Sequence, residues 1–282
     1  MIVLAGQRFM RFVRGGQLVL VAVLSGCGWL EFSPNQTYVP ATERHLTTQN
    51  LARLASRSKA ATDTLRFVFV GDCQRFYDEA DDFVASVNQQ RDLDFVVIAG
   101  DISDFGLVRE MRWINRRLQK LKVPYLTVIG NHDEVGNGRA VYESVFGPLN
   151  YSFLYGGTRF ICLDTNGRES SFAGKIPNLS WLGQQLADTA GSRRSIVLCH
   201  VPPTDNDFDP ALVTPYVRAM RSSSQLVFHL AGHIHRFTDG EPFQDGVRYL
   251  TAYNFKKRRY NILSVWGQRQ FHLETVAYAP AP

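Results

Sequence analysis

Short polar signatures follow five apolar, strand-like runs of this chain, and no other feature constrains its fold as strongly. Each run has five residues dominated by Val, Ile, Leu and Phe, which is the pattern of a buried strand. The runs are Arg66–Val70, Phe95–Ala99, Tyr125–Ile129, Ser195–Cys199 and Leu226–Leu230. The signatures after them are Gly71-Asp72-Cys73-Gln74, Gly100-Asp101, Gly130-Asn131-His132-Asp133, His200 and Gly232-His233-Ile234-His235. Ligands gather outside the carboxyl ends of strands in open α/β sheets, so these side chains predict a metal site at one sheet edge.

The overall charge argues against a nucleic-acid-binding function. The net charge is +5, but the first 27 residues contribute Arg8, Arg11 and Arg14 and no acid. The remaining 28 basic and 26 acidic residues give a net charge of only +2, too small to indicate a nucleic acid partner. The one basic cluster, residues 256–259, is interpreted as a solvated turn between strands, with a polyanion patch as the alternative.

The N-terminus is typical of an exported protein. Arg11 and Arg14 precede the apolar run Leu18–Leu24, which is shorter than the roughly 20 residues that span a bilayer. The run ends in Ser25-Gly26-Cys27, and residues 24–27 resemble the lipobox of bacterial lipoproteins. That resemblance implies a signal peptide at 1–26, lipidation of Cys27 and a lipid anchor in the bacterial cell envelope. In a Gram-negative host, Gly28 predicts sorting to the periplasm-facing outer membrane. A buried N-terminal strand with a chance cysteine is the alternative.

The rest of the chain divides into a linker and one domain. Residues 27–63 are expected to be a tether and an adapter segment, and residues 64–282 the domain. Helical spacing of apolar residues predicts helices at 78–90, 107–121, 180–186 and 210–220. Gly156-Gly157 between two strand-like runs predicts a hairpin. This α/β pattern predicts two packed mixed sheets flanked by helices. Cys73, Cys162 and Cys199 lie in or beside strand-like runs and are expected to be buried free thiols.

Together the signatures resemble those of the calcineurin-like metallophosphoesterases, in the family's order and spacing, over about residues 65–236. The resemblance implies a four-layer α-β-β-α sandwich of the metallo-dependent phosphatase type. It also implies two divalent cations, Mn, Fe or Zn with Mg as a further option. The implied reaction is hydrolysis of a phosphate monoester or diester through in-line attack by a metal-bridging hydroxide.

The resemblance further implies a role for each residue of the signatures. The implied metal ligands are Asp72 and His235 at a first site, Asp101 between the sites, and Asn131, His200 and His233 at a second site. His132 faces the substrate and gives a proton to the leaving oxygen, and Asp133 orients His132 through a hydrogen bond. Asn131, His132 and Arg75 are the expected substrate contacts. Arg75 is a candidate phosphate clamp, as is Arg168, and an ordinary surface position is the alternative for both.

Gln74 departs from the family pattern, which usually has His at this position. An amide oxygen in place of an imidazole nitrogen favours harder cations such as Mn or Mg and weakens the first site. Binding through water, or contact with the substrate, are the alternatives for Gln74.

Other residues receive ordinary interpretations. His229 is expected in the core, Asp104 as a helix cap with a role beside the site as the alternative, and residues 204–209 as a solvated loop bordering the substrate pocket. The competing function is a cell-envelope scaffold lipoprotein that keeps the fold with little turnover. Apart from Gln74, the complete set of expected ligands argues against the scaffold.

Overall fold

Two mixed β-sheets run through the part of the chain that the structure describes. The structure is a computed structural model that describes residues 36–61 and 63–280, so the expected signal peptide and Cys27 lie outside the described residues. Sheet 1 has the strand order β11-β10-β1-β2-β3, in which β1, β2 and β3 are parallel. Its strands are β1 (Leu65–Val70), β2 (Phe95–Ile98), β3 (Tyr125–Thr127), β10 (Arg259–Trp266) and β11 (Gln270–Ala277).

Sheet 2 has the order β4-β5-β6-β7-β9-β8, and its four middle strands are parallel. Its strands are β4 (Tyr151–Tyr155), β5 (Thr158–Cys162), β6 (Arg194–Leu198), β7 (Leu226–Ala231), β8 (Thr238–Gly240) and β9 (Arg248–Thr251). The predicted hairpin at Gly156-Gly157 is the β4–β5 connection. The basic cluster forms the predicted turn, since η4 (Phe255–Lys257) links β9 to β10 and its two lysines are exposed.

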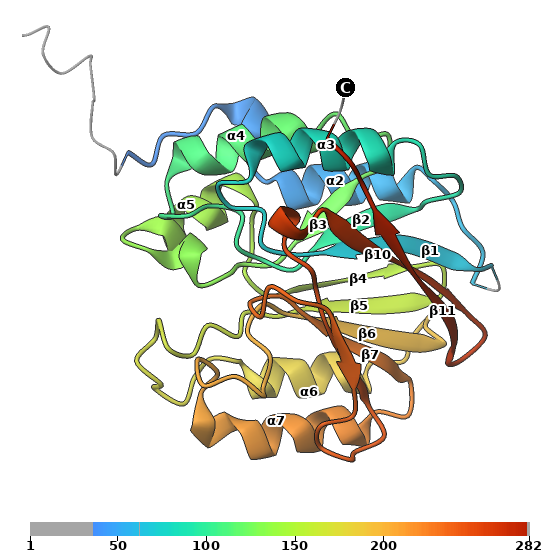
Figure 1. The fold of residues 1–282 in the computed structure, drawn as a ribbon. Coiled ribbons are helices and arrows are strands. Elements are labelled where there is room, and N and C mark those ends of the chain that lie inside the picture. Colours follow the sequence, from blue (N-terminus) through green and yellow to red (C-terminus); the bar gives the residue numbers. More distant parts are fainter. Residues whose placement is uncertain (1–35, 62, 281–282) are drawn as a thin grey trace, which may run out of the picture. The chain divides into compact units, whose positions relative to one another are not determined.

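Helices cover the outer face of each sheet, as Figure 1 shows with α3 and α4 above and α6 and α7 below. The helices of the sheet 1 side are α2 (Leu46–Ala55), α3 (Tyr77–Val87), α4 (Val108–Leu118) and α5 (Gly138–Val145), and those of the sheet 2 side are α6 (Leu179–Ala187) and α7 (Pro210–Ser222). The described residues also form two short 3₁₀ turns, η2 (Ala41–Glu43) and η3 (His132–Glu134). The expected α-β-β-α sandwich is confirmed. No helix within residues 36–61 and 63–280 has both the length and the apolar character needed to cross a bilayer.

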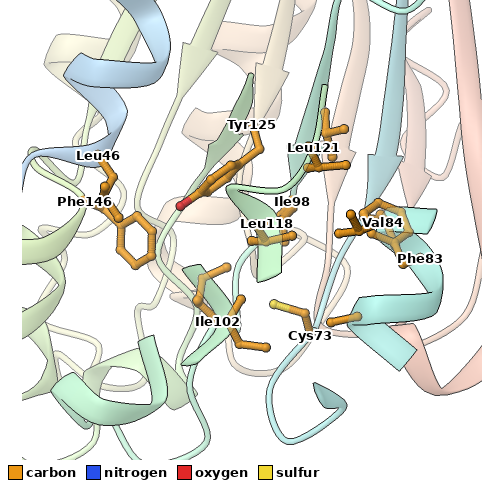
Figure 2. Packing of buried hydrophobic residues seen from close by; sticks show 14 of the residues in the cluster. Leu46, Cys73, Phe83, Val84, Ile98, Ile102, Leu118, Leu121, Tyr125 and Phe146 are labelled. Atoms are coloured by element: carbon orange, nitrogen blue, oxygen red, sulfur yellow. The ribbon is translucent and has the colours of Figure 1, made fainter. Parts of the chain in front are cut away.

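Three apolar layers hold the sandwich together. Along β1, Phe67 and Phe69 face sheet 2, whereas Val68 and Val70 face the helices, because successive strand side chains alternate between faces. Burial on both faces explains why the strands read as continuous apolar runs. Figure 2 shows the layer between sheet 1 and its helices, in which Cys73 lies among the buried apolar side chains. Cys73, Cys162 and Cys199 are buried free thiols, as expected.

The segment before β1 packs against the domain. We expected a tether and adapter as far as residue 63, but the compact unit already begins at Thr37. Val39 and Leu46 are buried in the layer between sheet 1 and its helices. Asn50 Oδ1 accepts a hydrogen bond from the backbone N–H of Tyr125, at 3.3 Å. Residues 37–61 therefore form part of the domain, because their apolar side chains complete its outer layer.

Candidate metal centre

The signatures after β1, β2, β3, β6 and β7 meet at one edge of the sandwich, and both sheets contribute. Backbone hydrogen bonds tie the first two loops together, since the N–H groups of Cys73 and Gln74 both donate to Asp101 O at 3.0 Å. In the first loop Cys73 packs into the core, whereas Asp72 and Gln74 contact other ligand candidates. The structure thus brings together all seven side chains that the sequence suggested as ligands.

Four of these residues surround the expected second site. His200 Nε2 lies 3.0 Å from Asn131 Oδ1 and 3.3 Å from Asp101 Oδ1. His233 Nδ1 lies 3.1 Å from the same Asn131 oxygen. His200 Nδ1 is 2.7 Å from the backbone oxygen of Ala99, which can only accept, so Nδ1 carries a proton and donates it. Nδ1 is thereby fixed as a donor, and Nε2 faces the two oxygens.

The electrostatics of this cluster favour positive charge. Burial works against a charged His200 ring, yet the Asp101 and Asp72 carboxylates and the Ala99 backbone oxygen together outweigh it and raise the pKa of His200 to about 10. Burial, together with the charge of His200, lowers the pKa of His233 and keeps its ring neutral, which is the form that binds a cation. A divalent cation would supply the positive charge that these buried oxygens favour.

The expected first site contains buried oxygen atoms without partners. His235 Nε2 lies 3.2 Å from Asp72 Oδ1, and Gln74 Nε2 donates to Asp101 Oδ2 at 3.1 Å. Asp72 Oδ2 and Gln74 Oε1 are buried, and neither has a hydrogen-bond partner among the described residues. A buried acceptor without a partner costs about 1–3 kcal/mol. These oxygens fit a hard cation, and ligand atoms of Asp72, Asp101 and His200 come within 4.8 Å of one another.

The glycines of the signatures give the ligand side chains their space. A Cβ at Gly100 would lie 2.7 Å from Cγ of His200 and closer still to its Nδ1. A Cβ at Gly130 would lie 2.9 Å from Cγ of Asp101 and closer still to its Oδ1. Gly therefore precedes these ligands because another ligand from a neighbouring strand end occupies the position of its missing side chain.

Four ligand residues adopt the left-handed backbone conformation that most side chains avoid. The φ angles are +51° at Asp72, +54° at Asp101, +67° at His233 and +57° at His235. Each costs roughly 1–2 kcal/mol, so surrounding contacts must impose these conformations. The backbone turns sharply at each position and aims the side chain across the sheet edge.

His132 lies beside the ligands, but its hydrogen-bond partner differs from the one we predicted. Its Nδ1 is 3.0 Å from the backbone oxygen of Asp104 and 3.4 Å from Asp104 Oδ1. Asp133 does not contact this ring. It accepts hydrogen bonds from the backbone N–H groups of Gly130, Ile102 and Ser103, and from the Ser103 hydroxyl at 2.8 Å. The orienting role predicted for Asp133 is wrong, because its buried side chain ties the β2 loop to the β3 loop.

Asp104 lies beside the site, a position that the sequence offered only as the alternative to a helix cap. We expected it chiefly as a helix cap, but the side chain of Glu110 accepts from the N–H groups before α4 instead. Asp104 contacts both His132 and the Arg75 guanidinium. The Arg75 side chain is 58% exposed, so it lies at the site and remains accessible. The sequence did hold a signal for this position, since Asp104 follows Asp101 by three residues in the same strand-end loop.

The remaining candidates have other surroundings. Arg168 pairs with Asp207 at 2.7 Å, an interaction the sequence did not reveal. Asp205 and Asp207, in the loop after β6, both approach His233. His229 is a core residue as predicted, since it is buried and its Nε2 lies 2.9 Å from the hydroxyl of Tyr216.

Comparisons with known proteins agree with this geometry. Residues 65–237 match the family of calcineurin-like phosphoesterases. A stretch of 140 residues is 30% identical to a glycerophosphodiester phosphodiesterase of Enterobacter lignolyticus, covering 43% of this chain and 47% of that protein. A stretch of 148 residues is 29% identical to a Fibrobacter succinogenes protein named "Probable cyclic nucleotide phosphodiesterase", covering 48% of this chain and 54% of the relative. The chain thus spans about half the length of these curated relatives. A dimetal phosphatase from Danio rerio shares the fold, with a TM-score of 0.59 at 15% identity over 76% of this chain and 99% of that one.

Proposed function

Because the chain belongs to the calcineurin-like phosphoesterases, we propose that it is a metal-dependent hydrolase of phosphate esters. The observation that carries this proposal is the convergence of His200 Nε2 and His233 Nδ1 on one oxygen of Asn131, beside Asp101. Those atoms come from four separate strand ends. A scaffold protein that had lost turnover would have no need to keep them aligned.

The described residues fit a centre of two divalent cations. Asp72 and His235 would hold the first cation, with the free oxygen of Gln74 as a further ligand. Asn131, His200 and His233 would hold the second, and the Asp101 carboxylate would lie between the two. Divalent cations at such a site lower the pKa of water and offset negative charge on phosphoryl oxygens. The oxygen atoms around the first position favour Mn, with Fe, Zn and Mg as the other candidates.

His132 supplies the proton for the leaving oxygen. The backbone oxygen of Asp104 only accepts, so His132 Nδ1 carries a hydrogen, and a second proton on Nε2 makes the ring an acid. The Asp104 carboxylate lies 3.4 Å from the same nitrogen, so both acceptors of Asp104 face this side of the ring. The side chain is 38% exposed, which leaves the ring accessible to a substrate.

Arg75 binds the phosphate in this proposal. Asp104 holds its guanidinium beside His132, and a guanidinium can donate two parallel hydrogen bonds to phosphate oxygens. Arg168 is not assigned this role, because its partner Asp207 approaches His233, whereas the partner of Arg75 contacts the proton donor His132.

A panel of phosphate esters tests the function. The names of the two bacterial relatives favour a diester, so bis(4-nitrophenyl) phosphate is compared with 4-nitrophenyl phosphate in the presence of Mn, Fe, Zn or Mg. We expect metal-dependent release of nitrophenol, faster from the diester, and little release by Asp101→Asn. Tight metal binding with no turnover of any ester in a broad panel would establish the scaffold instead.

Lipid anchoring through Cys27 is proposed on the sequence of residues 1–28 alone. Mass spectrometry of the mature protein from a bacterial membrane fraction is expected to show an acylated Cys27 at the N-terminus. A mature chain that retains residues 1–26, or an unmodified Cys27, refutes the anchor.

A further inference from the structure

Two carboxylates outside the expected ligand set approach the His233 ring. Asp205 Oδ1 lies 3.4 Å from His233 Nε2, and Asp207 Oδ2 lies 3.6 Å from the same nitrogen. Both acids belong to the loop between β6 and α7, which we interpreted from sequence as a solvated loop. All three side chains are mostly buried, with 17–28% of their surface exposed. The approach therefore occurs in a partly water-excluded place.

The two nitrogens of His233 face different surroundings. Nδ1 lies 3.1 Å from Asn131 Oδ1, inside the expected second site. Nε2 points the other way, toward the two acids. A neutral imidazole can bind a cation through Nδ1 only if its single proton is on Nε2. In that tautomer Nε2–H is a donor, and the carboxylates are the acceptors that it meets.

Contacts independent of His233 hold the acids in place. Arg168 binds Asp207 twice, through its guanidinium at 2.7 Å and through its backbone N–H to Asp207 O at 3.1 Å. Asp205 Oδ1 accepts from the backbone N–H of Asp207 at 2.9 Å. Phe208, the next residue, is buried in the layer beneath sheet 2 and anchors the loop. The positions of Asp205 and Asp207 therefore do not depend on their contacts with the His233 ring.

We propose that Asp205 and Asp207 position His233 for metal binding at the second site. Their carboxylates accept a hydrogen bond from Nε2–H of His233. This bond holds the tautomer whose Nδ1 lone pair faces the site and strengthens Nδ1 as a ligand. The inference rests on the proposed two-cation centre and names two positioning residues for it. Partners of this kind typically contribute 10–100-fold to metal affinity.

A double-mutant cycle on the full chain tests this role. Mn²⁺ affinity is measured from the electron paramagnetic resonance of free Mn²⁺ during titration. Asp205→Asn combined with Asp207→Asn is expected to weaken binding of the second-site Mn²⁺ about 10–100-fold in the wild-type background. In a His233→Ala background the same pair is expected to change affinity less than about 3-fold, since the ring through which the acids act is gone.

The cycle also separates positioning from simple charge. If the acids only attract cations at a distance, their removal weakens binding equally in both backgrounds, and the proposal fails. If Asp205, Asp207 and His233 bind a cation of their own, wild type binds three Mn²⁺ and the double variant two, which also overturns it. Unchanged affinity in the wild-type background has the same consequence.

Asp188→Asn is the matched control for Asp207→Asn. Asp188 pairs with Arg159 at 2.8 Å, as Asp207 pairs with Arg168 at 2.7 Å, but it ends α6 at the opposite edge of sheet 2. Asp188→Asn is expected to leave Mn²⁺ affinity unchanged. Metal-free thermal unfolding checks the loop, and each variant is expected to lose no more than about 4 °C, the effect of one surface ion pair. Because metal affinity is read without any substrate, failure of this role is distinguishable from absence of esterase activity.

Discussion

Replacing Gly100 by Ala tests whether packing between strand ends builds the metal centre. Gly100 has φ of +86° and precedes Asp101. An alanine Cβ there would lie 2.7 Å from His200 Cγ. Gly246 provides a matched control, since its φ is +76° and nothing lies within 4 Å of an added Cβ. Both substitutions therefore strain the backbone, and only one of them displaces a ligand.

The structure sets the size of the two effects. A left-handed alanine costs about 1–2 kcal/mol, so backbone strain alone should lower the unfolding temperature of both variants by about 2–8 °C. Ordinary contact begins at 3.4 Å, so the His200 ring must retreat by about 0.7 Å or more, whereas metal–ligand distances tolerate only about 0.2 Å. The retreat also weakens the hydrogen bond from His200 Nδ1 to Ala99 O, worth about 1 kcal/mol.

Thermal unfolding of the metal-free protein and Mn²⁺ titration provide the assay. We expect Gly100→Ala to weaken Mn²⁺ affinity at the second site, which contains His200, by more than about 100-fold, the upper range for disturbed ligand positioning. Gly246→Ala should bind Mn²⁺ as wild type does. Equal Mn²⁺ affinity in the two variants would refute the reasoning, because the steric conflict with His200 would then have no consequence.

Three further predictions concern residues around the centre. His132→Ala should lower kcat by about 10²–10⁴-fold with metal content near normal, as elemental analysis of the purified variant can check, and loss of metal would contradict its role. Asp133→Ala should act on stability instead, since it removes the acceptor of four buried donors; a wild-type melting temperature would argue against this. Burial lowers the pKa of His229 to about 3, so stability should fall as pH drops from 6.5 toward 3, by about 1.4 kcal/mol per pH unit. Urea unfolding measured across this pH range should show that the stability of His229→Gln changes less with pH than that of wild type. An equal pH dependence in the two proteins would contradict the lowered pKa of His229.

The sequence predicted the framework of the site because strand ends have a strong local signal. Apolar runs such as Phe95–Ala99 are buried on both faces, and the polar residue after each run has to lie at the sheet edge. The order of elements then determined which loops meet. Helix α5 was missed, since its apolar residues occupy a short stretch of eight residues that follows a turn.

Orientation could not be predicted from spacing. Asp133 follows His132 directly, yet its side chain turns inward, and Asp104 from another strand end contacts the ring. The left-handed φ of Asp72 depends on tertiary contacts, so no local pattern reveals it. The same holds for Gln74, whose amide nitrogen donates to Asp101 and whose buried oxygen has no hydrogen-bond partner among the described residues. In each case contacts between distant loops decide where a side chain points.

A centre of two cations depends on Asp101, because its carboxylate contacts residues of both expected sites. The most direct test is turnover of bis(4-nitrophenyl) phosphate by wild type and Asp101→Asn as Mn²⁺ is added in known equivalents per chain. We predict that wild-type activity rises until two equivalents are bound, and that Asp101→Asn stays nearly inactive throughout. Wild-type-like turnover by Asp101→Asn, or full activity with a single equivalent, would contradict a two-cation phosphoesterase.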